Sequence, residues 1–547
     1  MRLSIFHSTS RALREFFLVL VQGYERAPRV SQLPNVYKIN TRREGMTVIE
    51  YKKYFERLKG EGDFSRLGKV FKTKEKYYFF DTGTGKILEC TEIEYNILKQ
   101  LGEENTLDVK KLEYSLKDIQ ATINDIISMV EKENILKATP LEKFEGEHFE
   151  DLTQSIPQNM RQVVLEVTEN CNLRCDYCIY QNSFSGFRDF SPRSMSEETA
   201  IKAIDYILKN SYRDEIYVGF YGGEPLLKFD LIKKCVSYAL ENRGEKKVTF
   251  SMTTNGVLMT EEKAEYFASI PEFSLMFSID GDEKTHNEHR KLENGRGSFE
   301  LSLKGFQNAL KAYGDRRKMI SVSTVVSPPY TKEKFEDMQE FFEQYAKDLN
   351  MNCTYVELSE NNAPIYTEEE RERLENRMPL LAWDKQKTPS DKERSFTYYP
   401  QIGAFMGIHT RPICDVPFMW HKFNGCCVPG TRRLYVTTEG KFLACERIGE
   451  APSIGDVEKG FDIEAIKKYY IDEYMQKSLV ECQNCWASTL CGICYANCYD
   501  ANGLNMKKKM ACCEEEKYTV EQQLIYYHEI LENNPELLEP LNHMIVT

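Results

Sequence analysis

The sequence predicts an α/β fold around a parallel sheet, with a smaller mixed domain before it and a cysteine-rich extension after it. Three patterns along the 547 residues indicate this organisation: a hairpin followed by amphipathic helices, then hydrophobic runs that alternate with helical stretches, then a dense set of cysteines. Strands and helices that alternate at this spacing form parallel βαβ units. We therefore expect the main sheet in the middle of the chain.

The segment from about 69 to 141 predicts a small sheet with three helices. Two strand-like runs flank Asp81-Thr-Gly-Thr-Gly, whose glycines allow a tight hairpin. Thr91 lies three residues before Glu94, the spacing of a capping box, and predicts the start of a helix that runs to Leu101. Two further amphipathic segments follow. One has an apolar stripe formed by Ile119, Ile123, Ile126, Ile127 and Val130.

The middle of the chain predicts six parallel strands separated by helices, of which residues 195–210 and 229–243 are clear examples. Polar side chains of such a fold gather at the carboxyl ends of the strands, where the βα loops converge. The expected strands are Gln162–Thr168, Glu215–Phe220, Lys247–Thr253, Ser274–Ile279, Met319–Val326 and Asn352–Leu358.

A loop with three cysteines follows the first of these strands. Cys171, Cys175 and Cys178 in VTENCNLRCDYCIY have the spacing Cys-x3-Cys-x2-Cys. Thiolate sulfur is the preferred ligand of iron–sulfur clusters. Three thiolates suit a four-iron cube with one iron left free to bind another molecule. For the loop alone, a zinc site or three buried thiols are the alternatives.

Polar motifs also follow the next strands. Tyr217–Pro225 reads YVGFYGGEP, and its glycines let the backbone approach a ligand closely. Val248–Gly256 ends in Thr-Asn-Gly, and Ser274–Gly281 ends in the pattern S-x-D-G. Arg290 stands in HNEHR, where a guanidinium fork suits a carboxylate. A surface ion pair is the alternative for this arginine.

In spacing and order, these motifs resemble those of the radical S-adenosylmethionine (SAM) enzymes. The resemblance implies a partial (β/α)6 barrel over residues 155–360 and a four-iron cluster whose free iron chelates SAM. In that family one electron splits SAM into methionine and a 5′-deoxyadenosyl radical. The GGEP segment holds the SAM amino group, and no general acid or base is implied. The implied SAM-binding residues are Tyr177, Gly222, Gly223, Glu224, Pro225, Asn255, Ser278, Asp280 and Arg290.

A second set of cysteines lies in residues 406–515, after a polar linker over 361–405. Its order, C-x12-G-x4-C, then CQNCWASTLCGICYANCYD, then a final pair, resembles the SPASM extension of radical SAM enzymes. That extension binds two auxiliary four-iron clusters. The match departs at Cys494, which follows Cys491 after two residues where the family has three. A pair of zinc ribbons is the alternative.

The SPASM resemblance implies ligands for both auxiliary clusters. The second cluster is expected at Cys482, Cys485 and Cys491, closed by Cys512 or Cys513. The first cluster is expected at Cys427 and Cys445, with Cys494 or Cys498 and with Cys414 or Cys426 as a further candidate. The isolated cysteines, expected to be core residues, are Cys90, Cys235 and Cys353. Residues 516–547 are expected to form a C-terminal helix.

Residues 65–145 resemble the winged-helix leader-recognition domain of enzymes that modify ribosomally made peptides. In that module an extended leader peptide adds to the sheet as a strand. A DNA-binding winged helix and a structural cap are the alternatives. The mixed charges of the segment and the formal net charge of −13 disfavour nucleic acid as a partner.

Composition favours a reducing cytoplasm, because the 17 cysteines cluster at metal-ligand spacings. Residues 1–64 form a lead-in with a short apolar stretch broken by arginine, without the cleavage site of a secretory signal, and no function is assigned to them. No run approaches the roughly 20 apolar residues of a membrane span. We expect a cytoplasmic protein without a membrane anchor.

Together these resemblances predict a radical SAM oxidoreductase that matures a cysteine-rich, ribosomally made precursor peptide. It would bind the leader and install a thioether of the sactipeptide or ranthipeptide type, with carbon–carbon cross-linking as a close variant. The expected cofactors are three [4Fe-4S] clusters and SAM. The expected partners are the precursor and a low-potential electron donor of the flavodoxin or ferredoxin type. The alternatives are an anaerobic sulfatase-maturating enzyme that makes formylglycine, and a non-catalytic iron–sulfur electron carrier or redox sensor.

Overall fold

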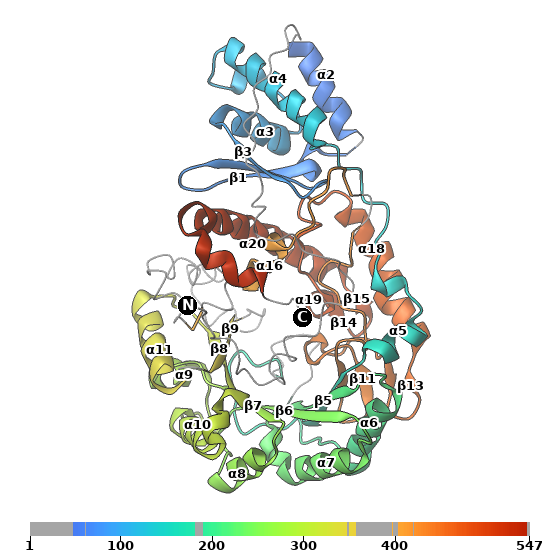
Figure 1. Ribbon diagram of the computed structural model, residues 1–547, viewed down its shortest axis with the longest axis vertical. Coiled ribbons are helices and arrows are strands. Elements are labelled where there is room, and N and C mark those ends of the chain that lie inside the picture. Colours follow the sequence, from blue (N-terminus) through green and yellow to red (C-terminus); the bar gives the residue numbers. More distant parts are fainter. Residues whose placement is uncertain are drawn as a thin grey trace, which may run out of the picture.

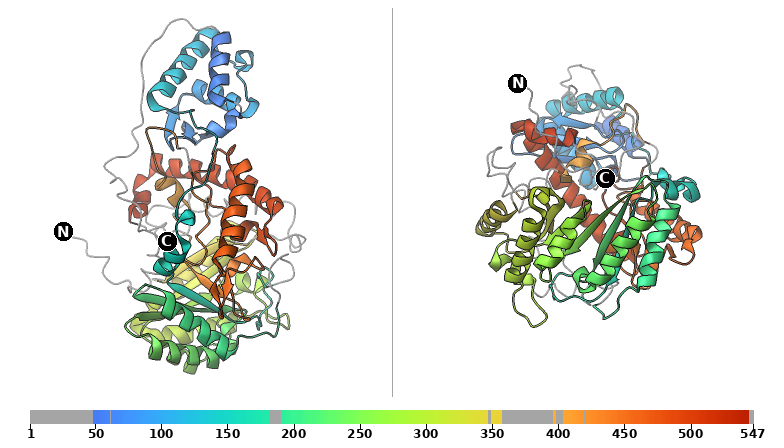
Figure 2. Two further views of the ribbon diagram at one scale, coloured as in Figure 1. Left: turned by 90° about the vertical axis from the view of Figure 1, so that its right-hand side faces the viewer. Right: turned by 60° about the horizontal axis from the view of Figure 1, so that its bottom comes forward.

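The computed structural model describes residues 48–60, 62–180, 190–346, 349–356, 396–397, 403–418 and 421–543. These ranges form three parts along the long axis of the molecule (Figure 1). The N-terminal domain lies at one end and the parallel sheet with its helices at the other, while the C-terminal part lies between them (Figures 1 and 2). The expected linker over 361–405 falls almost entirely outside the described residues.

A ten-stranded sheet forms the main core. All six expected strands are confirmed, and they are parallel neighbours in chain order. They are β4 (Gln162–Thr168), β5 (Glu215–Gly222), β6 (Lys247–Thr254), β7 (Phe273–Ser278), β8 (Ile320–Val326) and β9 (Asn350–Tyr355). Helices cover their outer face (Figure 2, right). They are α6 (Glu197–Asn210), α7 (Phe229–Asn242), α8 (Glu261–Ser269), α9 (Glu283–His289), α10 (Phe299–Tyr313) and α11 (Lys332–Tyr345).

Strands of the C-terminal part extend this sheet, which the sequence did not predict. β10 (Leu434–Val436) pairs in parallel with β4. Three antiparallel strands continue outward from it: β11 (Lys441–Leu443), β12 (Gly455–Asp456) and β13 (Gly460–Phe461). Strands of two or three residues show too few alternations to be found from hydrophobic periodicity. The barrel sheet and the extension are therefore one continuous structure.

The N-terminal domain has a three-stranded sheet in the order β1-β2-β3. The expected hairpin is confirmed, and the side chains of Thr91 and Glu94 form the expected capping box. The prediction of three helices after the hairpin is wrong, because the segment between the other two forms only a short 3-10 turn at Val109–Lys111. The following helix begins after its N-cap, Ser115. The elements are α2 (Val48–Lys59), β1 (Gly68–Lys72), β2 (Tyr77–Asp81), β3 (Ile87–Cys90), α3 (Glu92–Glu104) and α4 (Leu116–Glu133).

Helix α20 (Met506–Asn533) connects the C-terminal part to the N-terminal domain. It begins ten residues before the expected boundary at 516, so Cys512 and Cys513 lie on it. Its second half packs under the β1–β2 face, where the Tyr78 hydroxyl donates a hydrogen bond of 2.7 Å to Glu532. The other elements are α5 (Leu152–Asn159), α16 (Met406–His409), α17 (Ile463–Ala465), α18 (Glu473–Cys482), α19 (Tyr495–Cys498), β14 (Tyr499–Asp500) and β15 (Gly503–Leu504).

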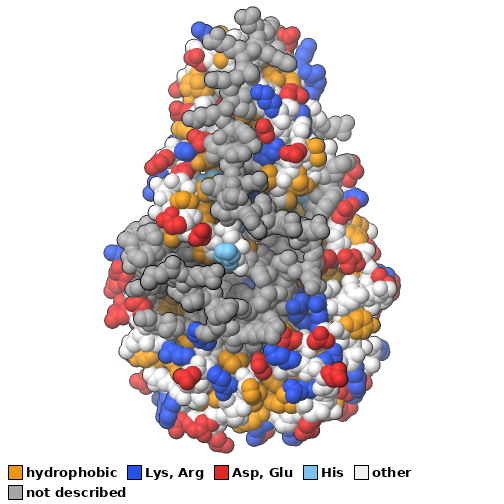
Figure 3. All heavy atoms as spheres, in the orientation of Figure 1, with side chains coloured by type: hydrophobic (Ala, Val, Ile, Leu, Met, Phe, Trp, Pro, Cys, Tyr) orange, Lys and Arg blue, Asp and Glu red, His pale blue; other side chains and the backbone are white. Residues whose placement is uncertain are grey.

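The surface carries charges of both signs. On the face drawn in Figure 3, Lys and Arg side chains of the described residues are interspersed with Asp and Glu over the barrel. Among the helices that the structure describes, none has the length and apolar content of a membrane span.

Candidate functional site

The loop with three cysteines leaves the carboxyl end of β4 and packs among apolar side chains. The thiols of Cys171, Cys175 and Cys178 lie close enough for their charges to interact. Burial is the main cause that raises the pKa of all three thiols, and the neighbouring thiols add to it at Cys171 and Cys175. Because iron ligation requires the thiolate, a bound cation must supply the charge that ionises this group.

The GGEP segment holds the start of this loop by backbone contact. The Gly223 N–H donates to the Thr168 carbonyl at 2.8 Å, and the Glu224 N–H donates to the Asn170 carbonyl at 2.9 Å. A Cβ atom on Gly223 would lie 2.2 Å from that Asn170 oxygen, and Gly222 has φ +134°. Glycine is therefore needed here for β5 to approach the cysteine loop.

The Glu224 side chain is a brace within the protein. Its carboxylate accepts hydrogen bonds from Leu226 N at 2.9 Å, Thr254 Oγ1 at 2.7 Å and Asn255 N at 2.8 Å. Burial raises the pKa of Glu224, and these three donors oppose the rise. Pro225 begins the short 3-10 turn that follows. The carboxylate thus ties the end of β5 to the end of β6.

We expect Glu224→Ala to destabilise the barrel by about 2–4 kcal/mol, because it leaves three buried donors without an acceptor. Glu224→Gln should cost less, since its amide oxygen still accepts. The midpoint of thermal unfolding measures both. Equal midpoints for wild type and Glu224→Ala would contradict the bracing role.

Asn255 reaches the cluster loop from the end of β6. Its Nδ2 donates to Asn172 Oδ1 at 2.8 Å and lies 3.8 Å from Cys171 Sγ. An amide N–H beside a thiolate stabilises its charge, and such contacts tune bound metal. Asn255 is therefore placed to act on the Cys171 thiol, an expected cluster ligand.

The S-x-D-G pattern and Arg290 form one buried ion pair. Arg290 Nε donates to Asp280 Oδ2 at 2.9 Å, and the Tyr177 hydroxyl donates to the same oxygen. The other carboxylate oxygen accepts from Val325 N at 2.9 Å. Burial is the largest single effect and acts to raise the pKa of Asp280. The charges of Arg290 and His286 and the hydrogen bonds from Tyr177 and Arg290 together outweigh it and hold that pKa below its usual value.

The position of Arg290 excludes a surface ion pair, because its side chain is buried. One guanidinium nitrogen lies 4.0 Å from Cys175 Sγ. The guanidinium also lies 5.4 Å from the centre of the Tyr177 ring. A fixed positive charge thus stands beside the cysteine loop, where it favours a bound anion or thiolate.

The inner face of the barrel sheet is lined with small polar side chains. In register, Ser251 of β6 lies beside Ser274 of β7, and Ser278 of β7 lies beside Ser323 of β8. All four are half-buried, and the half-buried Met276 lies between Ser274 and Ser278 on the same face of β7. Hydroxyl groups suit a polar ligand, so Ser278 stands on a surface fitted to one.

The cysteines of the C-terminal part form two neighbouring groups. The members of the first group interact electrostatically with one another. They are Cys426, Cys427, Cys445, Cys494 and Cys498. The same kind of interaction connects the members of the second group. They are Cys482, Cys485, Cys491 and Cys513. Cys498 interacts with Cys512 and Cys513 as well, so it lies between the two groups.

Two of the ligand alternatives are separated by this geometry. The Cys414 N–H donates to the Thr84 carbonyl at 3.0 Å, in the hairpin turn of the N-terminal domain. Cys426 instead interacts with Cys494 and Cys498. The structure therefore brings Cys426, and not Cys414, to the first group among the residues it describes.

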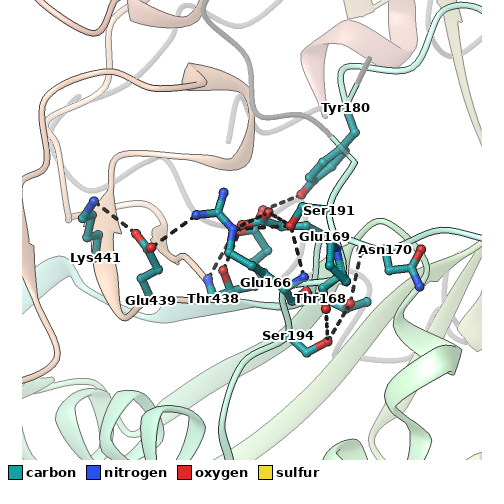
Figure 4. A network of polar contacts seen from close by, with 12 residues as sticks. Glu166, Thr168, Glu169, Asn170, Tyr180, Ser191, Ser194, Thr438, Glu439 and Lys441 are labelled. Carbon is teal, nitrogen blue, oxygen red and sulfur yellow. Dashed lines mark hydrogen bonds and ion pairs between the residues drawn. The ribbon is translucent and has the colours of Figure 1, made fainter. Parts of the chain in front are cut away.

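A buried polar network joins the barrel to the extension (Figure 4). Glu166 of β4 accepts from the Tyr180 hydroxyl at 2.7 Å and from Thr438 N at 3.1 Å. Glu169 accepts from Thr438 Oγ1 at 2.9 Å. These residues were not among those predicted from the sequence, although a glutamate inside the apolar strand QVVLEVT indicates a buried polar contact.

The ligands that these groups offer are cysteine thiols. Four-iron clusters are held by cysteine thiolates, and each of the three groups supplies at least three thiols. Among the described residues, no three His, Cys, Asp or Glu side chains converge as the ligands of a single metal ion do. The donor set fits the expected clusters.

Comparisons with known proteins give the family. A model described as the radical SAM superfamily matches residues 165–342. An uncharacterised protein of Methanocaldococcus jannaschii is 31% identical over 236 residues, which cover 43% of this chain and 77% of that protein. The radical SAM cyclopropyl synthase TigE of Paramaledivibacter caminithermalis is 22% identical over 450 residues, 79% of this chain and 88% of that enzyme.

Solved structures show the same fold. The anaerobic sulfatase maturase anSMEcpe with bound AdoMet aligns with a TM-score of 0.51 and 17% identity, over 70% of this chain and 96% of that one. The same enzyme with AdoMet and the Cp18Cys peptide aligns with a TM-score of 0.50 and 16% identity, over 70% and 99%. With the three-cysteine loop at the carboxyl end of β4, these matches lead to one conclusion. The chain belongs to the radical SAM superfamily.

Proposed function

We propose that the protein is a peptide maturase that binds the leader of a ribosomally made precursor and cross-links its core, most simply as a thioether. The observation that carries this proposal is helix α20, which bears Cys512 and Cys513 at one end and covers the N-terminal sheet with the other. Two comparisons support it. Similarity to a cyclopropyl synthase extends well beyond the barrel, and a peptide complex shares the fold.

The residues have separate tasks in this proposal. When bound, SAM and a reduced four-iron cluster supply a 5′-deoxyadenosyl radical that takes a hydrogen atom from the peptide. Cys171, Cys175 and Cys178 hold that cluster, and Asn255 and Arg290 place a dipole and a charge beside it. Thioether formation removes a hydrogen atom from carbon and a proton with an electron from the thiol. The C-terminal cysteine groups would hold the acceptor of that electron.

The edge of β3 is the proposed leader site. Among the described residues β3 pairs only with β2. Asp81 N donates to the Lys86 carbonyl, so Asp81 and Lys86 are a hydrogen-bonded pair. Because such pairs alternate along an antiparallel ladder, the N–H and C=O groups of Ile87 and Glu89 point away from β2. Since no strand of the described residues pairs with this edge, these groups can bind an added strand.

Proline at Glu89 tests this edge. Glu89→Pro removes an outward N–H without breaking the β2–β3 ladder. The probe is the peptide encoded by the short open reading frame nearest to the gene of this protein. We expect Glu89→Pro to weaken its binding about tenfold or more, because one main-chain hydrogen bond is lost and the proline ring blocks the edge. Fluorescence anisotropy with the labelled peptide measures the change.

Glu89→Ala is the matched control, because it keeps the N–H and removes the 2.9 Å ion pair with Lys76. It should bind the peptide as the wild type does. Equal affinity of the proline variant and the alanine variant would refute leader binding at β3.

Formylglycine formation in a sulfatase is the second candidate, favoured by the fold shared with anSMEcpe. That match covers 70% of this chain. The test incubates the reduced protein and SAM with a sulfatase peptide and, separately, with the peptide encoded next to the gene. Oxidation of cysteine or serine in the sulfatase peptide, with the other peptide left unmodified, would favour formylglycine formation over cross-linking.

A further inference from the structure

Lys509 is a buried lysine at the start of α20. Its side chain is only 1% exposed. The Nζ atom donates a hydrogen bond of 2.8 Å to the Tyr474 hydroxyl and lies 4.4 Å from the centre of the Tyr474 ring. Within the described part of the chain, no carboxylate lies at ion-pair distance from this amine. A buried ammonium without an anionic partner is costly, so its surroundings need an explanation.

The amine lies within electrostatic reach of cysteine thiols of both C-terminal groups. Lys509 acts electrostatically on Cys426 and Cys498 of the first group, favouring the thiolate of each. It acts in the same direction on the second group: Cys482, Cys491 and Cys513. The positive charge of Lys509 therefore favours the thiolate form in both groups of cysteines.

The position of the amine is fixed from two sides. The Tyr474 hydroxyl, which accepts from Lys509, itself donates to Asn424 Oδ1 at 2.7 Å. At the backbone, Lys509 N donates to the Asn505 carbonyl at 3.0 Å, within the first turn of α20. Lys507, two residues earlier in the run MKKKM, is exposed. Position in the fold, and not the basic run, distinguishes Lys509.

We propose that Lys509 is the shared counter-cation of the two auxiliary cysteine groups, a positioning residue that raises the reduction potential of the clusters they hold. The inference rests on the proposed function, in which these groups bind two iron–sulfur clusters. A thiolate-ligated cluster gains negative charge when it is reduced. A fixed cation nearby stabilises the reduced state more than the oxidised one, and charge is one of the levers that set such potentials.

The experiment compares anaerobically reconstituted wild type with Lys509→Met, Lys509→Arg and the exposed control Lys507→Met. Iron per chain is measured first, and the potentials of the clusters then follow from a redox titration monitored by electron paramagnetic resonance. The SAM cluster serves as the internal reference, because a different cation, Arg290, stands beside its cysteine loop.

We expect Lys509→Met to lower the potential of both auxiliary clusters, or to lose their iron, with the SAM cluster unchanged. Lys509→Arg should restore both properties, and Lys507→Met should match the wild type. Unshifted auxiliary potentials in Lys509→Met, or the same loss in Lys509→Arg, would overturn the inference. Wild-type protein with iron for the SAM cluster alone would refute the auxiliary clusters of the proposed function before any variant is compared.

Discussion

Replacement of Cys171, Cys175 and Cys178 by alanine is expected to remove the iron of one cluster and to abolish reductive cleavage of SAM. The three thiols share one loop at the carboxyl end of β4, and their charges interact. Cysteine thiolates hold four-iron clusters, so the triple variant has no ligands left at this loop. Iron per chain and 5′-deoxyadenosine, measured after reconstitution and reduction with dithionite, give the result.

Cys235→Ala is the matched control for this loss. Cys235 is buried in α7 and packs in the hydrophobic core of the barrel. Its replacement should leave iron content and SAM cleavage intact. If the triple variant kept the wild-type iron content, the assignment of the cluster to this loop would be wrong.

Arg290→Met is expected to destabilise the barrel by about 3–5 kcal/mol, because it leaves the buried Asp280 carboxylate without its cation. The two side chains are joined by a 2.9 Å contact, and their exposed fractions are 9% and 2%. Tyr177 and Val325 would remain as hydrogen-bond donors and cannot neutralise the charge. The midpoint of thermal unfolding measures the effect.

The double variant Arg290→Met/Asp280→Asn separates charge from packing. Since it removes both charges, it should recover much of the stability lost in Arg290→Met. Lys291→Met, at the half-exposed neighbouring position, should unfold as the wild type does. An unfolding midpoint of Arg290→Met equal to that of the wild type would exclude a stabilising ion pair.

The strands and motifs of the barrel could be predicted because each depends on local pattern. The run Gln162–Thr168 is apolar and is followed by a polar loop, which indicates both the strand and the side of the sheet where the chemistry lies. The same reasoning predicted that Gly223 and Asn255 lie near the cysteine loop. It depends on nothing but strand direction and the convergence of βα loops.

Side-chain partners could not be predicted from the same patterns. Glu224, Asp280 and Arg290 were predicted as SAM-binding residues. The structure adds their partners within the protein: Glu224 accepts from three donors, and Asp280 is paired with Arg290. Position at a strand end does not reveal which neighbour satisfies a buried charge. That choice depends on the packing of β6, β7 and β8 against one another.

Contacts between distant segments were also beyond the sequence. β10 is three residues long and joins β4 across more than 260 residues of chain, which no local period reveals. Cys427 was expected from its spacing to Gly440 and Cys445, and Cys426 beside it was only an alternative to Cys414, whereas the fold also brings Cys426 to Cys498. Lys509 is one of three consecutive lysines, and the residue pattern does not show which of them the fold buries.

Deuterium transfer from peptide to SAM tests the central claim most directly. The reduced, reconstituted protein is incubated with SAM and with the peptide encoded by the short reading frame nearest to its gene. In this peptide the carbon-bound hydrogens are replaced by deuterium. The account predicts 5′-deoxyadenosine that carries deuterium, together with a peptide that has lost one deuterium and one thiol hydrogen. Protein with its full complement of iron that forms no 5′-deoxyadenosine would contradict it.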